Sequence, residues 1–255
     1  MKLNSFFIEK DEIIEWDRFL SLLKEIEVPV VRNDDIVYHK YDFKYPKVFI
    51  GGGDWEINQS NFSITPELKL MIGTNLNIEK NEKILGMPIG MPSLSHDKII
   101  GDLDKIIKKN KETKQYVNMC YCGFRDSTYE SERSFVRNLF ENENWVTSTT
   151  YDRTEDGHSK YLNNIYNHKF ILCPRGNGID THRIWETLYL RSIPIVKKCT
   201  AMSHFYDLPI LWIDDWKEIN FEFLEEKYNE IINKDFNFEK LNIYYYVKKF
   251  KEIDE

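Results

Sequence analysis

The sequence predicts an α/β protein made of two Rossmann-like halves, each built on a parallel sheet. Short apolar runs of strand length alternate with longer segments whose apolar residues recur at helical spacing, and this alternation is typical of parallel sheets covered by helices. A polar and mostly basic tract at residues 108–115 separates two such series. We therefore expect an N-terminal domain over residues 1–110 and a C-terminal domain over residues 111–255, whose last helix packs back on the first domain.

Composition indicates an ordinary globular chain. The 255 residues are 42% hydrophobic and include 16 Phe, 15 Tyr and 6 Trp, which argues against disorder over most of the length. The net charge of −7 argues against general nucleic-acid binding, which needs a basic face. The apolar runs fall short of the roughly 20 residues of a membrane span, and the N-terminal segment is too weakly apolar for a signal peptide.

The first half opens with a helix and a series of short strands. Apolar residues recur at helical spacing over residues 11–26. Apolar runs of strand length follow at 28–31, 36–39 and 47–50. The third run ends in the sequence Gly-Gly-Gly-Asp-Trp at residues 51–55, so we expect a glycine turn at the carboxyl end of a strand.

The remainder of the first half contains more residues that begin or interrupt regular structure. A short helix is expected over residues 66–72, with Thr65 as its cap. Glycines and prolines interrupt residues 84–91, which indicates an extended connection. Apolar residues on one side then predict a helix over residues 95–109.

The second half repeats the alternation of strands and helices. Apolar runs predict strands at 116–122, 145–148, 170–173, 193–196 and 209–213. Helical spacing predicts helices at 131–141 and 161–167, one that begins near residue 180, and two more at 221–232 and 241–253. Because ligands of parallel sheets bind beyond the carboxyl ends of the strands, we expect the glycine turns of the two halves to meet in a cleft.

The most informative segment is Lys169 to Lys198, in which strand, glycine loop, helix and strand follow one another. Gly176 and Gly178 allow a tight turn of the chain, a close approach of the backbone to a ligand, or both. Asp180 or Thr181 caps the following helix. Such a unit leaves the N–H groups of the first helical turn facing an anion.

Two side chains on this helix indicate what the anion is. Arg183 and Glu186 are three residues apart and therefore share one face. An arginine suits phosphate oxygens and a carboxylate suits sugar hydroxyls, so together they indicate a nucleotide-sugar site. The alternative is a surface ion pair worth only a few tenths of a kcal/mol. His182 either contacts a phosphate or is a partly exposed helix residue.

The segment Phe170 to Glu186, followed by Ser192 to Val196, resembles the donor-site signature of exostosin-like glycosyltransferases. The likeness is greatest to small forms from microbes and large DNA viruses, and it extends loosely to residues 123–125 and 208–216. It implies a GT-B fold, in which two Rossmann-like domains with parallel sheets face each other across a cleft. The nucleotide-sugar lies mainly on the second domain and the acceptor mainly on the first, which is trimmed in so short a chain.

The resemblance also implies roles for individual residues. Arg183 takes the place of the diphosphate-binding arginine, and Glu186 that of the ribose-binding acid. The residues expected to bind the donor are Arg175, Gly176, Asn177, Gly178, Asp180, Thr181, His182, Arg183, Glu186 and Arg125. The donor is a UDP- or GDP-sugar, and the acceptor is a glycan or another hydroxyl compound.

Catalysis by such a site needs a general base on the acceptor hydroxyl, since the resemblance implies an inverting hexosyl- or pentosyltransferase. We select Asp54, because it follows a strand and a glycine turn in the first half; its alternative is a turn-forming or capping aspartate. Asp35, His39 and His96 are weaker candidates. Arg133, like Arg125, either adds positive potential opposite the phosphates or is a surface arginine.

No metal or cofactor is expected to be required. The helix N-terminus and the arginines can stabilise a leaving diphosphate by themselves. The adjacent carboxylates Asp34–Asp35 and Asp214–Asp215 diverge if they lie on strands, so neither pair matches a metal site.

The sequence also leaves alternative functions open and indicates a cellular location. A fucosyltransferase-like GT-B enzyme and a non-catalytic carbohydrate- or nucleotide-binding protein of the same fold remain alternatives. A dinucleotide-dependent oxidoreductase is disfavoured, because G-x-G-x-x-G does not follow the strand. The four cysteines lack C-x-x-C spacing and are interpreted as reduced thiols, so we expect a cytoplasmic protein, in the host cytoplasm if the source is a virus.

Overall fold

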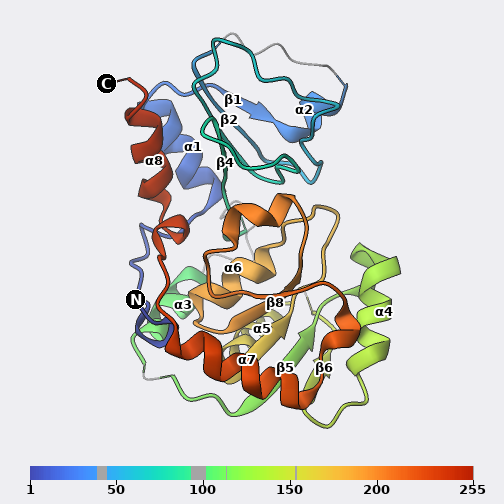
Figure 1. The fold of residues 1–255 in the computed structure, drawn as a ribbon. Coiled ribbons are helices and arrows are strands. Elements are labelled where there is room, and N and C mark those ends of the chain that lie inside the picture. Colours follow the sequence, from blue (N-terminus) through green and yellow to red (C-terminus); the bar gives the residue numbers. More distant parts are fainter. Residues whose placement is uncertain (39–44, 93–101, 113, 153, 255) are drawn as a thin grey trace.

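The computed structural model describes residues 1–38, 45–92, 102–112, 114–152 and 154–254. Within these residues the chain forms two lobes, one above the other in Figure 1, each with a parallel sheet. The sheet of the first lobe has the strand order β1-β2-β3-β4, and that of the second lobe β6-β5-β7-β8-β9. The expected fold class, α/β with two Rossmann-like domains, is confirmed.

The first lobe is built on four strands in sequential order. They are β1 (Val30–Arg32), β2 (Lys47–Gly51), β3 (Leu70–Gly73) and β4 (Ile84–Gly86). Every residue of β2 and β3 is buried, and Val48 pairs with Met71 in parallel register. Strands that are covered on both faces have apolar side chains in succession, and for that reason the run at 47–50 was recognisable in the sequence.

Helices α1 (Trp16–Glu25) and α8 (Ile243–Lys251) stand side by side against this sheet (Figure 1). Phe19 of α1, Phe49 of β2 and Phe250 of α8 share one buried core. The carboxylate of Glu15 caps α1 by accepting hydrogen bonds from the backbone N–H groups of Asp17 and Arg18. The last helix therefore packs on the first lobe, while the division expected at residue 110 stays a prediction.

Two of the expected elements in the first half are wrong. Residues 33–38 form a helix, α2 (Asn33–Tyr38), where a strand was expected over 36–39. Asp34 and Asp35 favour that helix, because they lie in its positive first turn. The helix expected over 66–72 is replaced by β3, since pairing with β2 buries its apolar residues better than an isolated short helix would. Residues 95–101 of the next expected helix lie outside the described residues.

The second lobe follows the expected alternation. Its strands are β5 (Asn118–Gly123), β6 (Val146–Thr149), β7 (His168–Leu172), β8 (Ile193–Lys197) and β9 (Leu211–Ile213). Its helices are α3 (Asp102–Asn110), α4 (Glu130–Phe140), α5 (Glu155–Asn167), α6 (His182–Tyr189) and α7 (Phe221–Asn233). Short 3₁₀ helices occur at Leu3–Ser5, Asp126–Thr128, Ala201–Phe205, Trp216–Glu218 and Glu239–Leu241. Helix α5 begins six residues earlier than expected, because Thr154 accepts a hydrogen bond from the N–H of Gly157 and caps it.

Both ends of the chain cross between the lobes. Leu3 and Phe6 pack in the core of the second lobe before the chain reaches α1, and the segment before α8 makes the reverse crossing. The two crossings lie side by side: Ile13 pairs antiparallel with Asn242, and the N–H of Ile243 donates to the carbonyl of Glu12 at 2.7 Å. An isolated β-bridge thus joins the two crossings.

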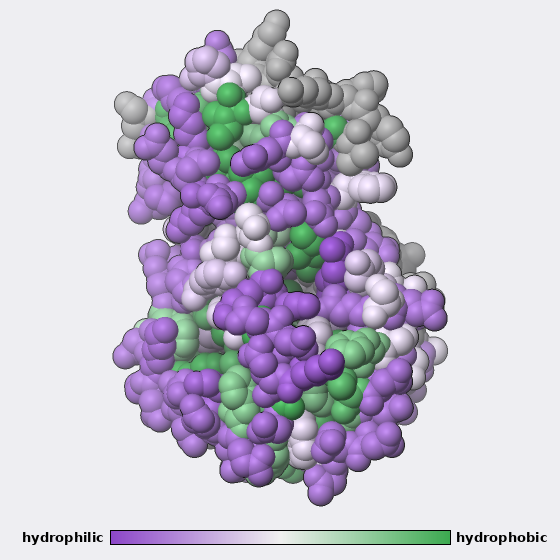
Figure 2. Space-filling view, turned by 45° about the vertical axis from the view of Figure 1, so that its right-hand side comes forward, coloured by the Kyte–Doolittle hydropathy of each residue, from purple (hydrophilic) through white to green (hydrophobic). Residues whose placement is uncertain are grey.

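The surface agrees with a globular chain that carries many charges. Figure 2 shows a waist between the lobes and a largely hydrophilic outer face with scattered hydrophobic patches. No helix within the described part of the chain has both the length and the apolar character needed to cross a bilayer.

Tyr189 joins α6 to both crossings, and its removal tests this connection. Its hydroxyl donates to the carbonyl of Leu241 at 2.9 Å and accepts from the N–H of Ile14 at 3.1 Å. Tyr189→Phe keeps the ring but leaves two buried backbone groups unpaired, so we expect a loss of about 1–3 kcal/mol in the free energy of unfolding, measured by urea denaturation. Tyr244→Phe, at an exposed position, is the control. Equal stability of both variants would contradict the assigned role.

Candidate functional site

Two adjoining hollows lie between the lobes, at the carboxyl ends of the strands. The arginine pocket belongs mainly to the second lobe, and the tryptophan chamber mainly to the first. The arginine pocket is lined by Asp54, Ile89, Pro92, Thr128, Arg133, Tyr151, His158, Tyr161, Gly176, Asn177, Gly178, Asp180, Thr181, His182, Arg183 and Glu186. The tryptophan chamber is lined by Trp16, Asp34, Gly52, Gly53, Asp54, Trp55, Thr74, Asn75, Ile89, Pro92 and His182. Asp54, Ile89, Pro92 and His182 line both, so the two hollows communicate.

The N-terminus of α6 opens into the arginine pocket. Thr181 occupies the N-cap position, yet its hydroxyl makes no capping bond and is buried with no hydrogen-bond partner among the described residues. Asp180 does not cap the helix either, since its oxygens accept from Trp185 and Ile89. The expectation of a side-chain cap is therefore wrong. The N–H of Ile184 donates to the carbonyl of Thr181 at 3.1 Å, whereas no described side chain caps the N–H groups of His182 and Arg183, which suits an anion.

Asp180 instead joins the two lobes. Its Oδ1 accepts from Nε1 of Trp185 at 2.7 Å, its Oδ2 accepts from the N–H of Ile89 at 2.9 Å, and its own N–H donates to Oδ1 of Asn75 at 2.9 Å. Burial raises the pKa of the Asp180 carboxyl to about 7, although the hydrogen bonds that it accepts act in the opposite direction. Its carboxyl holds α6 against the first lobe.

Gly178 is required where the glycine loop meets the first lobe. A Cβ atom at this position would lie 3.0 Å from Nδ2 of Asn75 and 3.2 Å from the carbonyl oxygen of Asp54. A larger residue would therefore require Asn75 or the backbone of Asp54, both in the first lobe, to shift by a few tenths of an ångström. Close approach, rather than a positive φ angle, accounts for glycine at position 178.

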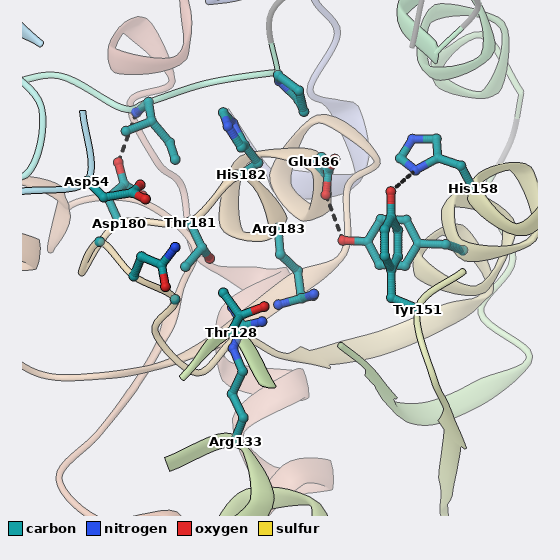
Figure 3. A pocket seen from close by; sticks show the side chains of 16 residues that line it. Asp54, Thr128, Arg133, Tyr151, His158, Asp180, Thr181, His182, Arg183 and Glu186 are labelled. Carbon is teal, nitrogen blue, oxygen red and sulfur yellow. Dashed lines mark hydrogen bonds between the residues drawn. The ribbon is translucent and has the colours of Figure 1, made fainter. Parts of the chain in front are cut away.

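Two buried arginines supply the positive charges of the pocket. Arg183 is 9% exposed and Arg133 is 5% exposed, and both point toward Thr128 (Figure 3). Nη2 of Arg183 donates to the carbonyl of Gly123 at 3.3 Å, whereas its Nε has no hydrogen-bond partner within the described residues. Burial, together with the charge of Arg183, lowers the pKa of Arg133 to about 10. Two nearby positive charges with spare donors favour an anion.

Glu186 and the aromatic residues form the opposite wall. Glu186 is 4% exposed, and its Oε2 accepts a hydrogen bond of 2.6 Å from the hydroxyl of Tyr161. Tyr151 and His158 lie beside it, with 2.7 Å between the Tyr151 hydroxyl and Nδ1 of His158 (Figure 3). Because Arg183 and Glu186 are both buried, the surface ion pair considered above is wrong. A buried carboxylate with remaining acceptor capacity suits a diol.

His182 and Asp54 lie where the two hollows meet. Both side chains are exposed and line both spaces. Nδ1 of His182 is 2.7 Å from the carbonyl oxygen of Gly90; since a carbonyl only accepts, Nδ1 carries a proton and Nε2 of the neutral ring is an acceptor. Either Asp54 or His182 can thus accept a proton at the junction.

Several expected site residues lie elsewhere. The side chain of Arg175 turns away from the arginine pocket, toward Glu56 at 3.4 Å and over the ring of Tyr129. Arg125 contributes its carbonyl, which accepts from Nη1 of Arg133 at 2.9 Å, and its side chain does not line the pocket. Asp35 lies on α2 and lines neither hollow. His39 and His96 lie outside the described residues.

Sequence reasoning missed part of the pocket wall. Thr128, Tyr151, His158 and Tyr161 line the arginine pocket but were not selected. The available signal was topological: the loop after β5 ends beside the loop after β7, because these strands are neighbours in the sheet. Across the described ranges, no three His, Cys, Asp or Glu side chains gather as a metal-binding group.

Comparison with known families identifies the class of protein that has this fold and site. Residues 102–253 match the model of the family described as the RXYLT1 C-terminal domain, which covers more than half of the chain. The chain therefore belongs to this family of exostosin-like glycosyltransferases. Among curated protein sequences, no match was found. The narrower likeness to microbial and viral forms stays a prediction.

The raised pKa of Asp180 predicts a stability that depends on pH. The folded pKa of about 7 exceeds the ordinary value of about 3.9, so the folded state holds the proton more tightly. This contribution to stability is fully present below pH 4 and is lost as the pH rises toward 7. We expect the melting temperature of the wild type to fall between pH 5 and pH 8 by more than that of Asp180→Asn. Asp11→Asn, at an exposed position, should keep the wild-type dependence; parallel curves for Asp180→Asn and the wild type would contradict this prediction.

Proposed function

We propose that this glycosyltransferase moves a sugar from a nucleoside-diphosphate sugar in the arginine pocket to a hydroxyl of a glycan in the tryptophan chamber. One observation carries the proposal: two buried arginines and an uncapped helix N-terminus converge on one pocket that opens into a second hollow. The family is named for a xylosyltransferase, so pentoses are candidates beside hexoses.

The pocket supplies what the leaving diphosphate needs. As the bond between the anomeric carbon and the diphosphate oxygen breaks, negative charge grows on that oxygen. Arg183, Arg133 and the first N–H groups of α6 oppose this charge with groups that are already in position. We infer that a metal is not required, because the protein itself provides this positive potential.

The remaining walls suit the nucleoside and the acceptor. Glu186, oriented by the hydroxyl of Tyr161, accepts hydrogen bonds from the ribose diol. Asp54 accepts the proton of the acceptor hydroxyl while the oxygen of that hydroxyl bonds to the anomeric carbon. Asp54 comes from the first lobe and Arg183 from the second, and both line the arginine pocket, which supports an inverting transfer with the base on one lobe and the diphosphate on the other.

Nucleotide binding tests the arginine pocket. UDP or GDP should raise the melting temperature of the wild type, because a ligand of the folded state stabilises it. Arg183→Ala should weaken binding by about 10- to 100-fold, the equivalent of the 1.5–3 kcal/mol typical of bonds to charged groups. Arg183→Lys tests the guanidinium with the charge retained. Arg125→Ala should bind as the wild type does, and equal shifts for Arg183→Ala and the wild type would exclude this donor site.

Turnover tests the base at the junction. Asp54→Asn should reduce kcat by about 10²- to 10⁴-fold while the Kd for the nucleotide stays unchanged. His182→Gln is the paired variant, because it also lines both hollows. If transfer survives in Asp54→Asn and is lost in His182→Gln, the role of the base passes to His182. Donor binding without turnover in the wild type would favour the non-catalytic alternative.

A further inference from the structure

The turn that carries Asp54 is held by side chains from other segments of the first lobe. Three of its carbonyl groups accept hydrogen bonds in this way: Gly52 from Nη2 of Arg32 at 2.8 Å, Gly53 from Nδ2 of Asn75 at 3.2 Å, and Trp55 from Nδ2 of Asn33 at 3.0 Å. The side chain of Asp54, in contrast, is exposed and forms no hydrogen bond or ion pair within the described ranges. The backbone is therefore fixed on both sides of a carboxylate that is itself free to act.

Asn33 is fully buried and directs both hydrogens of its amide at this part of the chain. Its Nδ2 donates to the carbonyl of Trp55 at 3.0 Å and to that of Thr74 at 3.1 Å. Because a carbonyl only accepts, the atom that faces both must be the nitrogen. The amide oxygen is buried without a hydrogen-bond partner in the described part of the chain, which lowers stability. The two N–H donors are therefore what the residue at position 33 supplies.

Asn75 links the same turn to the second lobe. Its φ of 53° lies in the left-handed region, which glycine adopts at least cost, so the backbone alone does not account for asparagine. The side chain accounts for it: Nδ2 donates to the carbonyl of Gly53, and Oδ1 accepts from the N–H of Asp180 at 2.9 Å. One buried amide thus sets the distance between the Asp54 turn and the segment that begins α6.

This framework matters because a base acts only from the right place. It must lie within hydrogen-bond reach of the proton that it accepts, and a displacement of about 1 Å can cost about 100-fold in rate. The short, exposed side chain of Asp54 has no partner among the described residues to hold it, so its position depends on its backbone. The carbonyls that precede and follow Asp54 are those bound by Asn75 and Asn33.

We propose that Asn33 and Asn75 are positioning residues for sugar transfer, which hold the carboxylate of Asp54 at the junction of the two hollows before the substrates arrive. This inference rests on the proposed function and on the assignment of the base to Asp54. Asn33 acts within the first lobe alone, whereas Asn75 also aligns the base with the N-terminus of α6.

A double-mutant cycle tests the proposal. Turnover is followed as release of UDP or GDP from a panel of their sugar conjugates, with methyl glycosides as acceptors. Asn33→Ala should reduce kcat by about 10- to 100-fold. The Kd for UDP or GDP should stay unchanged, because Asn33 does not line the arginine pocket. In the Asp54→Asn background, Asn33→Ala should reduce kcat by less than about 2-fold further, since both changes remove the same contribution.

A general loss of structure would give a different result, because the two losses in kcat would then multiply. Multiplied losses, or full kcat in folded Asn33→Ala, would overturn the positioning role. Asn61→Ala is the matched control: it removes an amide bond of the same kind, from Nδ2 to the carbonyl of Glu56 at 2.9 Å, and should leave kcat close to that of the wild type.

A second variant and a measurement without turnover cover the case in which Asn33→Ala does not fold. Asn75→Gly keeps the left-handed backbone but removes both side-chain bonds, so kcat should fall by about 10-fold or more, again without adding to Asp54→Asn. Fluorine NMR of the full chain labelled with 5-fluorotryptophan should show a shifted or broadened Trp55 resonance in Asn75→Gly and an unaltered Trp145 resonance. An unaltered Trp55 resonance would overturn the inference.

The same experiments separate this inference from the proposed function. Full transfer in Asp54→Asn would overturn the assigned base and, with it, the positioning role. Loss of transfer in Asp54→Asn together with full transfer in both asparagine variants would overturn the positioning role alone.

Discussion

The hydrogen bonds of Asp180 hold the site together. One buried residue binds Trp185 within α6, Ile89 in the connection after β4 and Asn75 at the edge of the first lobe. Because these partners come from both lobes, the glycine loop, the N-terminus of α6 and the Asp54 turn keep one relative position. Burial raises the pKa of the Asp180 carboxyl to about 7, and protonation reduces the cost of burying it.

This arrangement brings side chains of different chemistry from the two lobes into adjoining hollows. The second lobe contributes buried guanidinium groups, and the first contributes carboxylates and indoles. Arg183 is directed to the carbonyl of Gly123 and toward Thr128, away from Asp54, so its guanidinium does not pair with that carboxylate (Figure 3).

Much of the fold was predictable, because buried parallel strands leave continuous apolar runs. Arg183 and Glu186 were found for the same reason: they follow such a strand and a glycine loop. Errors arose where local signals compete. The short helix α2 and the short strand β3 depend on partners elsewhere in the chain. The role of Asp180 could not be predicted from the sequence, because its partners Ile89 and Asn75 lie 91 and 105 positions away.

The bridge between Ile13 and Asn242 joins the two segments that run between the lobes. One backbone hydrogen bond, from Ile243 to Glu12, accompanies it. The Tyr189 hydroxyl bonds to backbone groups of both segments, Ile14 and Leu241. Two stretches far apart in the sequence, one near each end of the chain, therefore depend on a single side chain of the helix that also carries Arg183.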